Sequence, residues 1–504
     1  MSMVEKMERK QVVVVGAGVA GCTAALEAAK LGLNVTLVDE HPQSLATMSL
    51  DAPYFYGAGL PNILSNRGLM AESVFGSNDL LIECLESGVD VMTSTCVWGS
   101  YRPGENSTQL TSGQLGLADE KRSWMIAYDH MVLAPGARDL VLPFPNWGLP
   151  GVTGACGGSA LLDRYKVFEG ENIVILGSGN LALRAAQSAL RAGLKISGIV
   201  EVAPELQGDA AHVAELKATG ISFYLSHTVL QAIGKIKVEG IRIVRVDDNL
   251  APISGTEDEI ACDAICMAFG AVPNIELAAV TDCKIVFDAA RGGWIPATDQ
   301  SMETTQNSVF VVGDGAMVSE AMFLDPNLAM EQAKRAARTI AHKEGLAALE
   351  SGNTPDHGTS LYPPWAWHRS LVNAGGLDVM VCQCEEVSRR GLLDLSLPRY
   401  LQSEVRRPGG GLAGLSEGGQ ASQDLVKRLT RAGMGHCQGK RCRDHSAMLL
   451  ADNASRELSA ISPGSYRTPV RPLSLNVLWA DDETEETRRD WRTWIHAADG
   501  IPEI

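Results

Sequence analysis

Two glycine-rich loops, each between a short β-branched run and a helix-like segment, constrain the fold of this 504-residue chain more than any other feature. In the first, Gln11–Val15 leads into Gly16-Ala-Gly18-Val-Ala-Gly21. The run is typical of a buried parallel strand, and an alanine-rich helix over 22–32 and a second strand over 34–38 are expected after it. This order of elements predicts a Rossmann-like unit, in which helices connect parallel strands.

The spacing of the first loop has a physical reason. Gly16 permits the tight turn, Gly18 lets the backbone approach a pyrophosphate, and Gly21 allows close packing of helix and strand. Asp39, 18 residues past Gly21, can accept hydrogen bonds from ribose hydroxyls. The free N–H groups at the helix N-terminus attract phosphates. The loop therefore predicts a bound dinucleotide, against the alternative of a glycine-rich turn without a ligand.

A later segment favours FAD as this dinucleotide. Asn307–Val312 reads as a buried strand and is followed by Gly313-Asp314-Gly315. This is similar to the return motif of two-dinucleotide flavoproteins such as glutathione and thioredoxin reductases, in which the aspartate holds the ribityl and phosphate portion of the flavin. The alternative role for Asp314 is a helix cap. The distance of about 300 residues between the two motifs predicts an interrupted FAD domain.

The segment that interrupts the predicted FAD domain contains the second glycine-rich loop. The segment His130–Arg138, with Gly136, resembles the crossover strand of the same flavoproteins, and a proline-rich link over 142–151 marks the entry to a new domain. There the run Ile173–Leu176 leads into the loop itself.

The ligand of the second loop stays open from the sequence. Gly177 and Gly179 are followed by Ala182, which the fingerprint tolerates at its third position. Glu201 ends the next strand, and an acid there suits a ribose 2′-hydroxyl and rejects a 2′-phosphate. Three alternatives stand: bound NAD, another adenine nucleotide or FAD, and a fold that has lost its ligand.

Four cysteines form a separate constellation, Cys382-Gln-Cys384 and Cys437-Gln-Gly-Lys-Arg-Cys442. Four thiolates suit either a [2Fe–2S] cluster or a structural zinc ion. Zinc knuckles favour Cys-x2-Cys spacing, which neither pair has, so the spacing favours the iron–sulfur cluster. The stretch between the pairs includes a glycine-rich loop over 407–420.

Composition excludes some partners. The net charge of −17 argues against nucleic acid and anionic membrane surfaces. The N-terminus lacks the apolar stretch of a secretion signal, and no run is suited to an integral membrane segment. The other seven cysteines stand singly, mostly in apolar runs, as expected of free thiols in a reducing cytoplasm. We expect a cytoplasmic protein, and any attachment to the inner membrane would be through partners. The catalytic residues are unknown, because no substrate-side acid or base stands out.

The predicted fold class is α/β: a two-dinucleotide-binding-domain flavoprotein, with one Rossmann-like unit inserted in the other, plus a small helical [2Fe–2S] domain. The expected divisions are an FAD-binding domain over 1–140 and 290–345, a second Rossmann-like domain over 141–289, a linker over 346–375, an iron–sulfur domain over 376–455 and a tail over 456–504.

The motifs together resemble a known family. The segment from Cys382 to Cys442 looks like the bacterioferritin-associated ferredoxin-type [2Fe–2S] domain. Residues from about 10 to 475 resemble the A subunits of opine oxidases. The flavin/iron–sulfur subunit of hydrogen cyanide synthase and the α subunits of dye-linked proline or hydroxyproline dehydrogenases belong with them.

The resemblance implies cofactors and partners. Cys382, Cys384, Cys437 and Cys442 would hold a [2Fe–2S] cluster. A separate β subunit of the amino-acid-oxidase type would bind its own FAD and oxidise the amine. Some relatives also have an FMN between subunits, and a small ferredoxin-like subunit is a further partner of this kind. An electron acceptor completes the expected assembly.

The chain departs from this family in three places. After Asp39 the family usually has a Pro-Gly-Gly-Gln turn, whereas this chain has Glu40-His-Pro-Gln and then an unrelated segment to Gly57. The loop over 407–420 is longer than usual. The tail from 479 to 504 is extra.

Three functions are weighed. The first is the electron-transfer α-type subunit of a heteromeric FAD/iron–sulfur dehydrogenase that oxidises an amine, opine or imino acid on its partner. The second is a stand-alone NAD(P)H-dependent flavin/[2Fe–2S] reductase, which Glu201 favours. The third is a non-catalytic assembly subunit.

Overall fold

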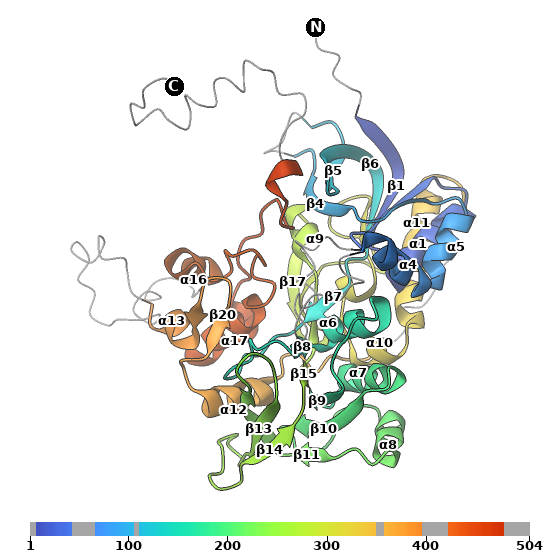
Figure 1. Cartoon of the computed structure of the whole chain (residues 1–504). Helices are drawn as coiled ribbons and strands as arrows, with labels where there is room; N and C mark the ends of the chain where they lie inside the picture. Colours follow the sequence, from blue (N-terminus) through green and yellow to red (C-terminus); the bar gives the residue numbers. More distant parts are fainter. Residues whose placement is uncertain (1–6, 43–65, 105–109, 349–356, 396–421, 478–504) are drawn as a thin grey trace, which may run out of the picture.

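The structure is a computed structural model that describes residues 7–42, 66–104, 110–348, 357–395 and 422–477. Two sheets form its frame, and a small helical unit lies beside them (Figure 1). Expectations for the segment that replaces the family's turn beyond residue 42, for the loop over 407–420 and for the tail from 479 concern residues outside this description.

The first sheet has seven strands in the order β3-β2-β1-β6-β5-β4, with β19 also beside β6. Strands β3, β2, β1, β6 and β19 run parallel, while β4, β5 and β6 form an antiparallel meander. The long β6 pairs with β5 along its first half and with β19 at its last three residues. The strands are β1 (Glu8–Val15), β2 (Val35–Val38), β3 (Asp90–Met92), β4 (Cys96–Tyr101), β5 (Gly113–Ala118), β6 (Ser123–Leu133) and β19 (Val309–Val311).

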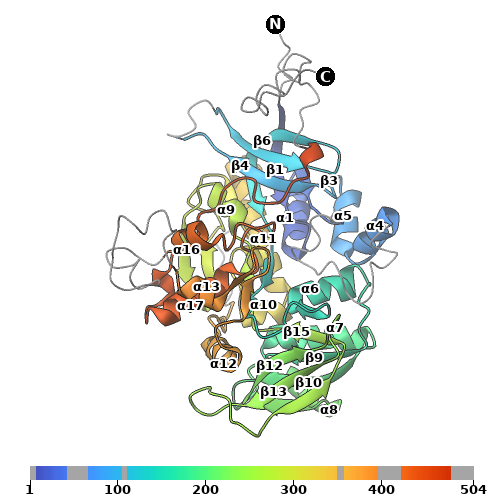
Figure 2. The ribbon, with the colours of Figure 1, turned by 60° about the vertical axis from the view of Figure 1, so that its left-hand side comes forward.

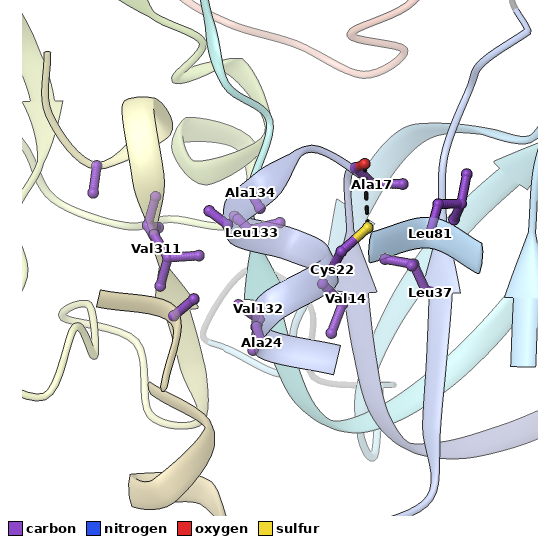
Figure 3. Packing of buried hydrophobic residues seen from close by; sticks show 14 of the residues in the cluster. Val14, Ala17, Cys22, Ala24, Leu37, Leu81, Val132, Leu133, Ala134 and Val311 are labelled. Carbon is purple, nitrogen blue, oxygen red and sulfur yellow. Dashed lines mark hydrogen bonds between the residues drawn. The ribbon is translucent and has the colours of Figure 1, made fainter. Parts of the chain in front are cut away.

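Helix α1 (Val19–Lys30) connects the first two strands and packs between this sheet and α11 (Asn327–Lys343). Figure 3 shows Cys22 and Ala24 of α1 against the sheet, near Val14. Small side chains on this face let helix and sheet approach closely. The expected helix over 22–32 starts earlier in the structure, because extended Gly18 is already its N-cap. Two further helices, α4 (Arg67–Gly76) and α5 (Asp79–Glu86), lead to β3.

The second sheet is entirely parallel, in the order β11-β10-β9-β15-β8. Alternate residues of β9 enter different cores: Ile173 and Ile175 join one, Val174 and Leu176 the other. This two-sided burial explains why the strand is continuously apolar. Its strands are β8 (Val152–Gly154), β9 (Asn172–Leu176), β10 (Lys195–Glu201), β11 (Phe223–Leu225) and β15 (Ala264–Met267).

Helix α7 (Asn180–Arg191) follows β9, and α8 (Ala210–Ala218) follows β10. An antiparallel meander packs on the second sheet and contributes to one of its cores; it comprises β12 (His227–Ile233), β13 (Gly240–Arg245) and β14 (Asp258–Ala261).

The chain leaves the first sheet through β7 (Ala137–Asp139) and returns through β16 (Ala271–Pro273). These two crossings pair with each other as an antiparallel ribbon. The two sheets are therefore joined by a hydrogen-bonded double connection rather than by two independent linkers.

The third unit is small and mostly helical, and in Figures 1 and 2 it lies to one side of both sheets. Its Val381 and Met448 belong to the same core as Val174 of the second sheet, so the unit packs as an extension of that core. Its elements are α12 (Trp365–Gly375), β20 (Met380–Cys382), β21 (Val387–Ser388), α13 (Arg389–Leu393), α16 (Gln423–Thr430) and α17 (Arg443–Asn453).

After α17 the chain returns to the first sheet. The N–H of Val470 donates to the carbonyl of Trp98 on β4 at 2.8 Å, and Arg471 forms an ion pair with Glu40 beyond β2. The described part of the tail thus fastens the third unit to the edge of the first sheet.

The predicted fold class is confirmed, since a first Rossmann-like sheet is interrupted by a second and is completed by β19. Within the part of the chain that the structure describes, no helix is both long and apolar enough to cross a membrane.

Replacing Gly21 by alanine should destabilise the first sheet. An added Cβ would lie 1.7 Å from the carbonyl oxygen of Gly16, which is backbone and cannot move aside. We expect Gly21→Ala to lower the free energy of unfolding by about 3 kcal/mol or more, measured by urea denaturation. The matched control is Gly76→Ala at the end of α4, where the added Cβ meets no atom within 4 Å. Equal denaturation midpoints for the two variants would contradict the packing role of Gly21.

Candidate nucleotide and thiolate sites

The first glycine loop opens into a large cavity. Gly16 has φ +103°, and a Cβ there would lie 2.2 Å from the carbonyl oxygen of Ala134. A Cβ at Gly18 would meet no atom within 4 Å, because this residue faces the cavity. No side chain caps the N-terminus of α1, so its N–H groups are available to an anion.

The cavity has a volume of about 1030 Å³, which is large enough for a dinucleotide. It runs from the first loop, past the crossover strand, to the return motif. Its lining includes every site residue predicted for these three segments: Gly16, Gly18, Gly21, Asp39, Gly136, Gly313 and Asp314.

Asp39 directly follows β2 and forms hydrogen bonds with the first loop. Its carboxylate accepts hydrogen bonds from the N–H of Ala17 at 2.6 Å, and from the N–H and Nδ1 of His41 at 2.7 and 2.8 Å. Burial alone would raise the pKa of Asp39, but the His41 ring and these backbone donors lower it to about 2. The carboxylate is therefore ionised and keeps acceptor capacity toward a ribose.

Asp314 lies on the other side of the cavity, directly after Gly313, whose φ is +65°. Burial raises the pKa of Asp314, and the charge of Arg184 opposes this effect. Among the residues that the structure describes, none donates a hydrogen bond to the Asp314 carboxylate. A polar ligand group in the cavity could thus be its partner. The role of this residue in holding FAD stays a prediction.

The second glycine loop has the same backbone turn as the first, but protein side chains lie against it. Gly177 has φ +104°, and Gly179 is the N-cap of α7. The N–H of Asn180 at the start of this helix donates to Oε2 of Glu320 at 2.6 Å. A Cβ at Gly179 would lie 3.0 Å from the same oxygen and 3.0 Å from Cδ1 of Leu361. A protein carboxylate and a leucine therefore stand where a pyrophosphate would bind.

Glu201 is also engaged within the protein. It is 2% exposed, its Oε2 accepts from the hydroxyl of Ser178 at 2.7 Å, and its Oε1 accepts from the N–H of Ala203 at 2.9 Å. Burial raises the pKa of Glu201. Ala182 packs in the core. The large cavity is not lined by any of the four residues predicted for this site: Gly177, Gly179, Ala182 and Glu201.

The four predicted metal-ligating cysteines come together in the third unit. Cys382 ends β20, Cys384 follows it, and Cys442 is the N-cap of α17. The thiols contact each other as two pairs, Cys382 with Cys442 and Cys384 with Cys437. Three of the four are 2% exposed, and only Cys384 is partly open to solvent.

Hydrogen bonds between the thiols shift their pKa values in opposite directions. The contact with Cys442 and the N–H groups of Gly433 and Glu385 lower the pKa of Cys382 to about 6, against the effect of burial. The contact with Cys384 lowers the pKa of Cys437 in the same way. The same contacts raise the pKa of the partner thiols Cys442 and Cys384, so one thiol of each pair ionises before the other.

Four clustered thiols can hold either of two metal centres. Within the described residues, no group of three or more Cys, His, Asp or Glu side chains is arranged around a single ion position. A single zinc ion needs four ligands at one point, whereas a [2Fe–2S] cluster takes two thiolates at each iron. The two thiol pairs also interact electrostatically with each other, so all four thiols lie in one cluster.

Sequence reasoning did not connect the two sites. Gln383, Lys440 and Arg441 line the nucleotide cavity as well as belonging to the cysteine-bearing loops. It also missed Glu320 on α10 (Glu320–Leu324), because the residue lies 140 positions from Asn180 and in no motif. A contact between such distant segments leaves no periodic signal in one sequence.

Comparison with known proteins supports the resemblance predicted above. Residues 10–340 match the family described as pyridine nucleotide-disulphide oxidoreductase, and residues 415–482 match the sarcosine oxidase A3 domain. The opine oxidase A subunit of Agrobacterium tumefaciens (strain Ach5) is 24% identical, over 92% of this chain and 90% of the relative. Hydrogen cyanide synthase subunit HcnB of Pseudomonas protegens is 24% identical, over 94% of this chain and 98% of the relative. The predicted relationship to these proteins is confirmed.

A solved structure shares the fold. The crystal structure of L-proline dehydrogenase from P. horikoshii superposes with a TM-score of 0.59 at 19% identity, covering 94% of this chain and 81% of that one. The family match extends over the first sheet, the inserted second sheet and the return through β19. The chain thus belongs to the pyridine nucleotide-disulphide oxidoreductase family and is an FAD-dependent oxidoreductase.

Proposed function

We propose that this chain is the electron-transfer subunit of a heteromeric dehydrogenase, in which a partner of the amino-acid-oxidase type oxidises an amine, opine or imino acid. In such an assembly FAD exchanges electron pairs and a [2Fe–2S] cluster passes electrons singly. The four cysteines would hold the cluster, and the first glycine loop with Asp39 and Asp314 would hold FAD. An interfacial FMN and a small ferredoxin-like subunit are further expected components.

One observation carries this proposal. The cavity that starts at the first glycine loop extends to Gln383, Lys440 and Arg441, which flank the four cysteines in sequence. Nη1 of Arg441 donates to Oε1 of Gln383 at 3.2 Å, so the two cysteine-bearing loops meet at the cavity wall. A nucleotide site and a thiolate site that share a wall are suited to exchanging electrons. The names of the relatives, each a subunit of a larger enzyme, support a partner.

The alternative of a stand-alone NAD(P)H reductase has less support. It needs a nicotinamide nucleotide in the second Rossmann-like unit, yet Glu320 and Leu361 cover the N-terminus of α7. A carboxylate there would repel a pyrophosphate and compete for the same N–H groups. We therefore favour the third of the alternatives for this site, a fold without a bound nucleotide. A purely structural assembly subunit would need neither the open cavity nor the clustered thiols.

Replacing Gly18 by valine should remove FAD and leave the protein folded. The side chain meets no protein atom near its Cβ and projects into the cavity where a pyrophosphate would approach the backbone. We expect FAD affinity to fall at least about tenfold, measured as flavin absorbance per protein after dialysis. Gly76→Ala, on a surface helix, is the matched control. Full FAD content in Gly18→Val would show that the first loop is not the flavin site.

Replacing Cys437 or Cys442 by serine should abolish the iron–sulfur cluster. Each change removes one of four ligands, and both residues are 2% exposed, so no solvent group replaces them. Iron content and visible charge-transfer absorption should be lost while FAD is retained, because the flavin residues lie on the first sheet. Cys96→Ser on β4 is the control, and it tests whether the loss of iron and absorption is specific to the four predicted ligand cysteines. Stoichiometric zinc without iron in anaerobically prepared protein would refute the cluster.

The isolated chain should oxidise neither amines nor NADH rapidly. It has no identified acid or base for an amine, and the second nucleotide site is covered by its own side chains. We expect dye-linked amine oxidation only after co-expression with an amino-acid-oxidase-like subunit. Rapid reduction of a dye by NADH with the purified single chain would establish the reductase instead.

A further inference from the structure

A buried arginine joins the nucleotide cavity to the cysteine-bearing loop. Arg138 lies in the middle of β7, two residues after Gly136, and lines the cavity. It is only 8% exposed. A buried guanidinium needs acceptors for its five N–H groups, because unpaired charge in a protein interior is strongly unfavourable.

Three of its acceptors come from the return crossing. Nη1 of Arg138 donates to Oε1 of Glu276 at 3.1 Å, to the carbonyl of Pro273 at 3.1 Å and to Oδ1 of Asn274 at 3.2 Å. Glu276 begins α9 (Glu276–Val280), three residues after the end of β16, the strand that pairs with β7. These contacts hold the guanidinium rigidly at the junction of the two sheets.

The other two acceptors belong to the third unit. Nε of Arg138 donates to the carbonyl of Lys440 at 3.0 Å, and Nη2 donates to Oδ2 of Asp444 at 3.1 Å. Lys440 lies between Cys437 and Cys442, and Asp444 follows Cys442 by two residues. The same side chain therefore lines the cavity and forms hydrogen bonds with the loop that supplies two of the four thiols.

Charged groups of both signs surround Arg138. Lys440 and Arg443 are cationic, and Arg138 forms ion pairs with the carboxylates of Glu276 and Asp444. Burial alone would raise the pKa of Glu276, but Arg138 above all, and then Lys440 and Arg443, lower it to about 2. We call these five residues the Arg138 charge cluster.

Charge near a metal–thiolate centre changes its reduction potential. A reduced [2Fe–2S] cluster carries one more negative charge than the oxidised form, so a nearby positive charge favours reduction. The effect is strongest where solvent is excluded, as it is around Arg138 and Lys440.

We propose that Arg138 is a positioning residue that holds the cysteine-bearing loop against the flavin cavity, and that the charges of Lys440 and Glu276 beside it shift the reduction potential of the iron–sulfur centre in opposite directions. This inference rests on the proposed function. It assigns two separable effects: Arg138 sets the distance between the cavity and the thiols, and the two neighbouring charges tune the potential.

The test uses full-length protein isolated with flavin and iron. The potential is measured by redox titration followed by the EPR signal of the reduced cluster. The rate is that of electron transfer from photoreduced flavin to the cluster.

Arg138→Lys keeps the charge and loses the branched guanidinium geometry. Lys440→Met removes a positive charge, and Glu276→Gln removes a negative one; neither changes the Arg138 side chain itself. Arg390→Lys, at an exposed ion pair with Asp378 in the same unit, is the control.

We expect Arg138→Lys to change the rate of electron transfer and the two charge variants to change the reduction potential. Arg138→Lys should slow flavin-to-cluster transfer about tenfold or more with the potential unchanged, because small displacements of reacting groups have large kinetic effects. Lys440→Met should lower the potential and Glu276→Gln should raise it, whereas Arg390→Lys should change neither quantity. Shifts of the same sign for the two charge variants, or an unchanged rate in Arg138→Lys, would overturn the inference alone. A wild-type protein without an EPR-active cluster would overturn the proposed function and the inference with it.

Discussion

The pairing of the two inter-sheet crossings is the interaction on which the arrangement of the sites depends. Strands β7 and β16 leave and re-enter the first sheet side by side, and their backbone hydrogen bonds fix the second sheet relative to the first. Arg138 lies on this ribbon. It donates hydrogen bonds to Glu276, which follows the return crossing, and to Lys440 and Asp444 in the third unit. Loss of the ribbon would separate the nucleotide cavity from the thiols, because both are anchored to it.

The two glycine loops share a backbone turn but differ in what lies against the helix that follows. Both Gly16 and Gly177 adopt left-handed φ values that allow the same turn, and both loops start a helix. The N-terminus of α1 opens into the cavity, whereas that of α7 receives the carboxylate of Glu320. An internal carboxylate satisfies the helix N-terminus as a phosphate would. The turn alone therefore does not decide what lies at the N-terminus of the helix.

Much of the fold could be predicted because it depends on local patterns. Buried parallel strands such as Val12–Val15 and Ile173–Leu176 are continuously apolar, and glycine occupies the tight turn of both loops and the close approach at Gly21. The fold class followed from these signals and is confirmed. The roles assigned to Asp39, Asp314 and the four cysteines stay predictions, although the first two line one cavity and the thiols lie together.

The sequence by itself determined the two Rossmann-like units, their nesting and the four-cysteine unit, because each of the motifs that mark them is formed by residues close together in the chain. Only the tertiary structure decided that Glu320 covers the second loop, that Arg138 bridges cavity and thiols, and that Gln383 reaches the cavity wall. These contacts join segments separated by 140 to about 300 residues. They are formed by packing of whole units, and a buried charge finds its partner only when that packing is complete.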